Sequence, residues 1–478
     1  MSRSGSLCLL LHSHMPYVEG FGTWPFGEEW LFEAVAASYL PLLDVLADTP
    51  VTLTITPVLA DQLDAMRDGG AGDRFERFVR DLRSLTHAED AKQLEVAGDV
   101  ELAAELRRAA GDYDRAADAF DRVGGDLISA IGALQRAELW TSGATHPVLP
   151  LLATRAGTAL QLAAGIDSHL DRFGDWCGGF WLPECAYRAG LEADLAEHGV
   201  RVFCVDQTDH LGLGALENLE PVRTPDGVVA VPIDWQTICL VWDMHRGYPG
   251  APAYRDYHRK TRYHLRPWNV AGEPYRPAVA RTLAREHARD FVAKVGRRLD
   301  LYAAERDRPG LVCCALDTEL LGHWWYEGPV WLAAAIEEAK AAGVALRTVS
   351  DAVAQCEPIE RTLQDSSWGM PKTFATWDSP AVAEIVFTQR RGELAVVAAA
   401  TRLGRSARLE RAARELLALQ SSDWAFQVTR DQAGPYPLER VAGHAAALHA
   451  ALTADGADPD PRVRNLQPQL DLSPLINP

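Results

Sequence analysis

Short apolar runs, many of them rich in β-branched residues, recur along the chain, and each is followed by polar residues. Runs of this kind are typical of strands buried on both faces of a parallel sheet. Stretches with apolar residues at helical spacing lie between many of them, so the chain predicts an α/β barrel of about seven or eight strands. The expected strands are 7–11, 51–55, 179–182, 200–205, 228–233, 237–242, 311–316 and 344–346, and the clearest helices are 29–46, 191–198, 278–303 and 329–342.

Two stretches depart from this alternation. Residues 86–139 are charged and rich in Ala and Leu at helical spacing, which predicts a helical insertion. After residue 361 the strand signals become rare and residues 407–420 and 438–452 are strongly helical. We therefore expect a catalytic barrel domain over 1–360 and an α-helical domain over 361–478, ending in an extended, Pro-rich segment from 455 onward.

Composition narrows the class of protein. The 478 residues carry 47 Lys and Arg against 66 Asp and Glu, a formal charge of −19, which opposes binding to nucleic acid and to anionic membranes. The longest apolar stretches, 7–11 and 394–400, are far shorter than the roughly 20 residues that span a bilayer. The N-terminus lacks a secretory pattern, and the eight cysteines form no CxxC pair, which predicts a cytoplasmic protein.

Residues whose side chains could take part in catalysis or binding stand where the predicted strands end. Polar residues at strand ends are common because loops begin there, so no single position is diagnostic. Several together indicate a site, since the carboxyl ends of barrel strands meet at one rim. The residues are His12, His14, Glu184, Asp206, Asp317 and Glu319.

Two of these strand ends suggest a pair of catalytic carboxyl groups. Glu184 follows an aromatic strand and a proline, whereas Asp317 and Glu319 follow an apolar strand that leads into an aromatic loop. Retaining glycosidases use such a pair, one group as nucleophile and the other as general acid. The spacing leaves open whether Asp317 or Glu319 is the acid, and a capping or salt-bridging role remains the alternative for either.

Tryptophans and histidines fit a carbohydrate site. Sugar rings stack on aromatic faces, although most of the fourteen tryptophans are expected in the core. Trp368 and Trp424 stand in polar surroundings and are the better candidates for a site. His12 and His14 could also bind a metal with distant carboxylates, as in a deacetylase or phosphoesterase, but hydrogen bonding to sugar hydroxyls is the favoured interpretation.

Five motifs in order along the chain resemble those of glycoside hydrolase family 57, and within it the 1,4-α-glucan branching enzymes. They are LHSHMPYV (11–18), WPFGEEWL (24–31), THPVLPLL (145–152), GFWLPECAY (179–187) and DTELLGHWW (317–325). The segments GYPGAPAYR (247–255), SSWG (366–369) and QSSDW (420–424) resemble the branching subgroup in particular.

The resemblance implies an incomplete (β/α)7 barrel followed by a helical domain, and a retaining double displacement on an α-1,4-glucan without metal or other cofactor. It assigns Glu184 as nucleophile and Asp317 as general acid/base. The glucan contacts that it implies are His12, His14, Trp24, His146, Trp242, His323, Trp368, Trp377 and Trp424.

One departure from the family pattern bears on the activity. Branching enzymes of this family carry a Tyr on a flexible loop after the nucleophile strand, and that Tyr is thought to shield the glycosyl intermediate from water. Residues 188–247 contain no Tyr. An α-amylase or a 4-α-glucanotransferase activity is therefore the main alternative to branching, ahead of a metal-dependent deacylase and of a catalytically silent glucan-binding protein.

Overall fold

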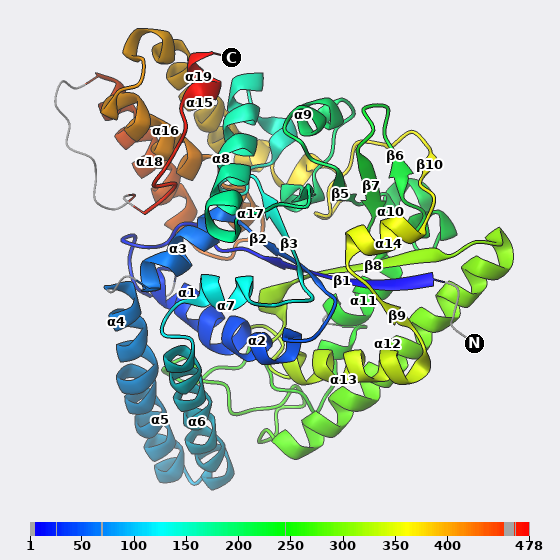
Figure 1. Ribbon diagram of the computed structural model, residues 1–478. Helices are drawn as coiled ribbons and strands as arrows, with labels where there is room; N and C mark the ends of the chain where they lie inside the picture. Colours follow the sequence, from blue (N-terminus) through cyan, green and yellow to red (C-terminus); the bar gives the residue numbers. More distant parts are fainter. Residues whose placement is uncertain are drawn as a thin grey trace.

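The computed structural model describes residues 5–477 apart from 25, 68–69, 244, 454–462 and 464. Seven parallel strands form its central sheet, and helices surround them (Figure 1). The strands pair in the order β8-β1-β2-β3-β4-β5-β7. Their bounds are β1 Gly5–Ser13, β2 Thr52–Ile55, β3 Glu138–Ser142, β4 Gly179–Trp181, β5 Val202–Val205, β7 Val229–Pro232 and β8 Gly310–Asp317.

The sheet curls into a barrel that stays open between β7 and β8, so the predicted incomplete (β/α)7 barrel is confirmed. Directly after β7, the backbone N–H of Asp234 donates to the carbonyl of Cys313 in β8 at 2.8 Å. Two short strands extend the β7 side: β6 (Val222–Arg223) is antiparallel to β7, and β10 (Ile359–Glu360) pairs with β6. A further short strand, β9 (Ala345–Leu346), pairs with β1.

The helices before residue 361 cover the barrel or form the insertion. The helices of the insertion start with α4, which lies before the predicted first residue 86, and they end before β3. The long helices α5 and α6 of the insertion form a hairpin that projects from the barrel (Figure 1). The bounds are α1 Glu28–Ala34, α2 Leu40–Leu46, α3 Pro57–Arg67, α4 Ala71–Glu76, α5 Arg83–Ala97, α6 Val100–Arg122, α7 Leu127–Gly132, α8 Arg155–Phe173, α9 Leu191–Glu197, α10 Thr208–Leu211, α11 Trp235–Trp242, α12 Pro277–Arg306, α13 Gly328–Ala342 and α14 Val349–Gln355.

The C-terminal part is helical, as predicted, and shares a core with α8. Its helices are α15 Ala383–Leu403, α16 Ala407–Leu419, α17 Asp423–Thr429, α18 Tyr436–Thr453 and α19 Ser473–Ile476. Leu160 and Ala164 of α8 belong to the same buried cluster as Val396 and Leu416. The domain boundary at residue 361 therefore stays a prediction. In the segment from 455, the extended conformation is wrong where α19 forms, and residues 455–462, 464 and 478 lie outside the described residues.

One predicted strand is wrong, and three strands were missed, namely β3 and the two-residue strands β6 and β10. Residues 237–242 belong to helix α11, because a short apolar run does not by itself distinguish a buried strand from a buried helix. Strand β3 was missed since its first residues were assigned to the helical insertion. None of the helices within the described ranges combines the length and apolar character needed to cross a bilayer.

A buried arginine secures the open side of the barrel. Arg298 of α12 donates to both carboxylate oxygens of Asp234, at 3.0 and 2.8 Å, and to the carbonyls of Gly214 and Ala215. The side chains of Arg298 and Asp234 are almost fully buried. The ion pair therefore ties the end of β7 to α12 and to the loop that precedes β6.

We expect Arg298→Met to lower the free energy of unfolding by about 3–5 kcal/mol, because it leaves the buried Asp234 carboxylate without its counter-charge. Urea unfolding followed by circular dichroism measures the change. The neighbouring Arg297 is exposed, so Arg297→Met is the matched control and should change stability by less than about 0.5 kcal/mol. Equal stability of the two variants would contradict the role given to Arg298.

Candidate active site

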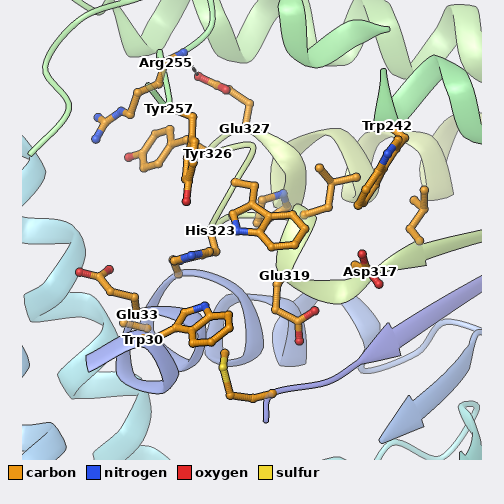
Figure 2. A pocket seen from close by; sticks show the side chains of 18 of the residues that line it. Trp30, Glu33, Trp242, Arg255, Tyr257, Asp317, Glu319, His323, Tyr326 and Glu327 are labelled. Atoms are coloured by element: carbon orange, nitrogen blue, oxygen red, sulfur yellow. Dashed lines mark hydrogen bonds between the residues drawn. The ribbon is translucent and has the colours of Figure 1, made fainter. Parts of the chain in front are cut away.

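A single large cavity of about 1870 Å³ opens at the carboxyl ends of the barrel strands. The predicted catalytic and glucan-binding residues line it except Trp424, and of the strand-end candidates only Asp206 is not part of its wall. Figure 2 shows Asp317 and Glu319 at the end of a strand, with His323 and Trp242 above them in that view. The register of the strands places two of these residues side by side, because His12 of β1 pairs with Asp317 of β8. The polar residues at strand ends thus do meet at one rim.

Glu184 is held by two hydrogen bonds from the C-terminal part of the chain. The indole N–H of Trp368 donates to Glu184 Oε2 at 2.7 Å, and the Ser422 hydroxyl donates to Oε1 at 2.7 Å. Burial raises the pKa of Glu184, and these two hydrogen bonds oppose the rise. The backbone of Glu184 adopts φ 62°, a left-handed conformation that a non-glycine residue rarely takes outside functional sites.

Asp317 is in a different environment. It is the last residue of β8, and no hydrogen bond from a described residue contributes to its pKa. Burial raises that pKa well above the usual value, and the negative charges of Glu319 and Glu184 raise it further. The protonated form of Asp317 is therefore favoured, while two donors stabilise Glu184 as a carboxylate.

Glu319 lines the same cavity but has partners of its own. Its carboxylate accepts hydrogen bonds from the Tyr39 hydroxyl and, at 3.1 Å, from the backbone N–H of His14. Burial raises the pKa of Glu319 to about 7, against the effect of these hydrogen bonds. The two acidic groups after β8 thus differ, since Glu319 is fixed by donors and Asp317 is not.

Three histidines stack beside Glu184. The ring centroids of His14 and His146 are 4.0 Å apart, and the Nε2 atoms of His12 and His146 are 3.0 Å apart. His14 also pairs with Asp423, with its Nε2 2.9 Å from Oδ2. Burial lowers the pKa of His12 and His146. Burial also opposes the charged form of His14, but Asp423 together with Glu319 and Glu184 outweighs it and raises the pKa of His14.

These histidines do not form the metal site that was weighed as an alternative. Both ring nitrogens of His14 already have partners, Asp423 and Thr56, and His12 Nε2 faces His146. Across the described part of the chain, no group of three or more His, Cys, Asp or Glu side chains has the arrangement of a metal-binding site.

His323 is positioned by a close backbone contact. The preceding Gly322 has φ +116°, and a Cβ there would lie 1.9 Å from the Ala37 carbonyl, so only glycine fits. The His323 backbone N–H donates to Ser38 Oγ at 3.1 Å. Burial, helped by the charge of Arg266, lowers the pKa of His323 to about 4, so the imidazole is neutral in the cavity.

The tryptophans divide into open and buried groups. Trp24 and Trp242 are 45% and 37% exposed at the cavity wall, which leaves part of each indole accessible to a sugar ring. Trp377 is 2% exposed and packs beneath Gly369. The predicted placement of Trp424 is wrong: it lies in α17, is fully buried, and donates its indole N–H to the Ala418 carbonyl.

Sequence reasoning missed several residues of the site. Ser422 and Asp423 stand in the QSSDW motif, from which only the neighbouring Trp424 was predicted as a site residue. Trp235 begins α11, and its indole N–H donates to the rim residue Asp206 at 2.5 Å. Lys372 pairs with the same carboxylate at 2.8 Å. Tyr39 and Lys372 stand outside the strand ends and carry no sequence signal.

The side of the cavity that follows β5 is formed by short elements. Thr208 and Asp209 of α10, Leu213, and Trp242 of α11 line this side. Leu213 is 64% exposed. The segment without a tyrosine thus lines the cavity with aliphatic, indole and small polar side chains, and no phenol from residues 188–247 covers Glu184.

Comparison with known proteins agrees with this geometry. A family profile described as Glycosyl hydrolase family 57 matches residues 8–363, and one described as 1,4-alpha-glucan branching enzyme, C-terminal, matches residues 388–465. A probable 1,4-α-glucan branching enzyme of Mycobacterium tuberculosis is 36% identical over 497 residues, which cover 95% of this chain and 92% of that protein.

Solved structures show the same arrangement. The crystal structure of a branching enzyme of this family from Pyrococcus horikoshii superposes with a TM-score of 0.92 at 32% identity, over 99% of this chain and 97% of that one. The α-amylase AmyC of Thermotoga maritima gives a TM-score of 0.84 at 25% identity, over 99% of both chains. The chain described above belongs to glycoside hydrolase family 57.

Proposed function

We propose that the chain is a retaining 1,4-α-glucan branching enzyme, which transfers a segment of α-1,4-glucan to a 6-hydroxyl group of a glucan acceptor. The observation that carries the retaining chemistry is the contrast between two carboxyl groups in one cavity, and the match of residues 388–465 to the branching-enzyme C-terminal profile favours transfer over hydrolysis. Hydrogen bonds from Trp368 and Ser422 favour the charged form of Glu184, and the surroundings of Asp317 favour its protonated form. Retaining glycosidases need this division of roles.

In the first step a carboxylate oxygen of Glu184 attacks the anomeric carbon of the donor glucan. The bond from that carbon to the leaving O4 breaks, and Asp317 gives its proton to the departing oxygen. In the second step an acceptor O6 attacks the same carbon, Asp317 takes the proton from that hydroxyl, and the bond to Glu184 breaks. The net reaction exchanges an α-1,4 for an α-1,6 linkage and needs no cofactor.

The remaining predicted residues fit roles in glucan binding. His12, His14 and His146 line the cavity beside Glu184, so their rings are placed to contact the sugar next to the cleaved bond, and His323 extends this set. The accessible parts of the Trp24 and Trp242 indoles suit stacking of further glucose units. The branching activity printed for the relatives from M. tuberculosis and P. horikoshii supports an α-1,4-glucan as substrate, with glycogen as the class of product.

All eight cysteines are free thiols, six of them buried, and this fits the reducing conditions of the cytoplasm as the place of action.

Hydrolysis is the second candidate. It is favoured by the missing tyrosine in residues 188–247 and by the likeness to AmyC, whose printed name is α-amylase. Water instead of a sugar hydroxyl would then attack the glycosyl intermediate.

Purified protein incubated with amylose separates the two activities. Proton NMR quantifies new α-1,6 linkages, and a reducing-sugar assay quantifies new chain ends. Branching predicts that new α-1,6 linkages exceed new reducing ends. Reducing ends without α-1,6 linkages would make the protein a hydrolase, and the absence of both products would remove the proposed activity altogether.

Glu184→Gln should lower turnover of amylose by at least about a thousandfold, because an amide does not form the glycosyl ester. Glu197→Gln is the matched control, since Glu197 is exposed on α9 and outside the cavity. Both proteins should show the same far-UV circular dichroism. A folded Glu184→Gln variant with near wild-type turnover would show that another group is the nucleophile.

The pH dependence tests Asp317. The reaction needs protonated Asp317 in the first step, so kcat/KM should fall as the pH rises through its elevated pKa. The negative charge of Glu319 helps to raise that pKa, and Glu319→Gln removes the charge while its amide oxygen still accepts hydrogen bonds. We therefore expect the alkaline limb of the profile to move to lower pH. An unchanged or alkaline-shifted limb would contradict the assignment.

A further inference from the structure

A buried lysine lies near the proposed nucleophile Glu184 and has no part in the proposed chemistry. Lys372 is 7% exposed, although lysine is seldom buried unless its charge is compensated. Its Nζ lies 2.8 Å from Asp206 Oδ2, 3.1 Å from the carbonyl oxygen of Trp368, and 3.2 Å from the centre of the Trp235 ring. Three groups from three separate segments therefore surround this one ammonium group.

The carboxylate that receives Lys372 is fixed by the barrel. Asp206 directly follows β5, is 1% exposed, and accepts hydrogen bonds from the Thr208 backbone at 2.9 Å and from the Trp235 indole at 2.5 Å. Buried ion pairs add little net stability over apolar side chains of similar size, so stability alone does not account for this one. The contact from Lys372 to Trp368 suggests a different use.

Trp368 connects Lys372 to the nucleophile. Its backbone N–H donates to the Glu184 carbonyl at 2.9 Å, and its indole N–H donates to Glu184 Oε2 at 2.7 Å. Its ring lies edge-on to Trp181 of β4, with centroids 5.0 Å apart. Within the same loop, the Ser367 backbone N–H donates to the Lys372 carbonyl at 3.3 Å, so Trp368 and Lys372 belong to one loop that this hydrogen bond closes.

We propose that Lys372 is a positioning residue: anchored on Asp206, its ammonium group holds the Trp368 carbonyl and thereby keeps the Trp368 indole N–H on the Glu184 carboxylate. The inference rests on the proposed function of Glu184 as nucleophile. Loss of the anchor lets the Trp368 loop shift, and Glu184 then loses one of its two side-chain donors and its fixed direction of attack. A displacement of about 1 Å at a reacting group lowers rates by up to about a hundredfold.

The test is a double-mutant cycle on the first chemical step. α-Maltotriosyl fluoride is the probe, because fluoride leaves without a proton from Asp317 and its release rate then reports on attack by Glu184. We expect Lys372→Met to lower the fluoride-release rate about tenfold or more, with KM changed by less than about twofold. Lys294→Met is the control, since Lys294 pairs with Asp290 on α12 and lies outside the cavity.

The coupling between the effects of substituting Lys372 and Trp368 tests the inference more sharply than either single variant does. Trp368→Phe removes the indole N–H, so adding Lys372→Met to it should cost less than about a further twofold. Full additivity of the two effects would overturn the inference. The same holds if Lys372→Met releases fluoride at the wild-type rate.

A second double variant separates positioning from fold stability. Asp206→Asn combined with Lys372→Met removes both buried charges and should restore resistance to urea, while the rate stays low because the bond to the Trp368 carbonyl is still missing. A restored rate would show that Lys372 only neutralises Asp206. A wild-type protein that releases no fluoride and forms no product from amylose would instead refute the proposed function.

Discussion

Of the carboxyl groups that line the cavity, four lie close enough for three of them to act on the charge of the fourth, and the cost of burying these four governs how the rest of the site is built. They are Glu184, Asp317, Glu319 and Asp423. A buried carboxylate needs donors or a counter-charge, and otherwise it binds a proton. Three of the four receive side-chain partners, whereas Asp317 receives none from the described residues and keeps its proton. The proposed division of roles, with Glu184 as nucleophile and Asp317 as acid, therefore follows from the unequal supply of donors.

Those donors come from segments far apart in the sequence. Glu184 depends on Trp368 and Ser422, and Asp423 in turn meets His14 at the end of β1. The barrel thus supplies Glu184, Asp317 and Glu319, while the C-terminal part supplies Asp423 and both side-chain donors of Glu184. This explains why the C-terminal helices share a buried core with α8, because a loosely attached domain would not hold hydrogen bonds of 2.7 Å on the nucleophile.

The sequence predicted the features that depend on local pattern. Buried strands and strand-end polar residues such as His12 and Glu184 were identified because each leaves a signature of a few consecutive residues. Trp424 and α11 were misassigned for a common reason: a polar neighbour or a short apolar run does not reveal which way a side chain points. Lys372 was not predicted from the sequence, because its importance comes from an ion pair with Asp206, 166 positions earlier in the chain.

The choice between branching and hydrolysis is made after the first step. Both outcomes use the same Glu184 and Asp317, so the environment of those two groups does not distinguish them. What differs is whether an acceptor glucan occupies the cavity while the intermediate exists. A cavity of about 1870 Å³ is larger than one sugar chain at the reacting carbon needs, and its partly exposed indoles at Trp24 and Trp242 offer binding energy to a second chain. Branching therefore requires an acceptor that stays bound and excludes water by its own presence, because residues 188–247 contain no tyrosine to cover the intermediate.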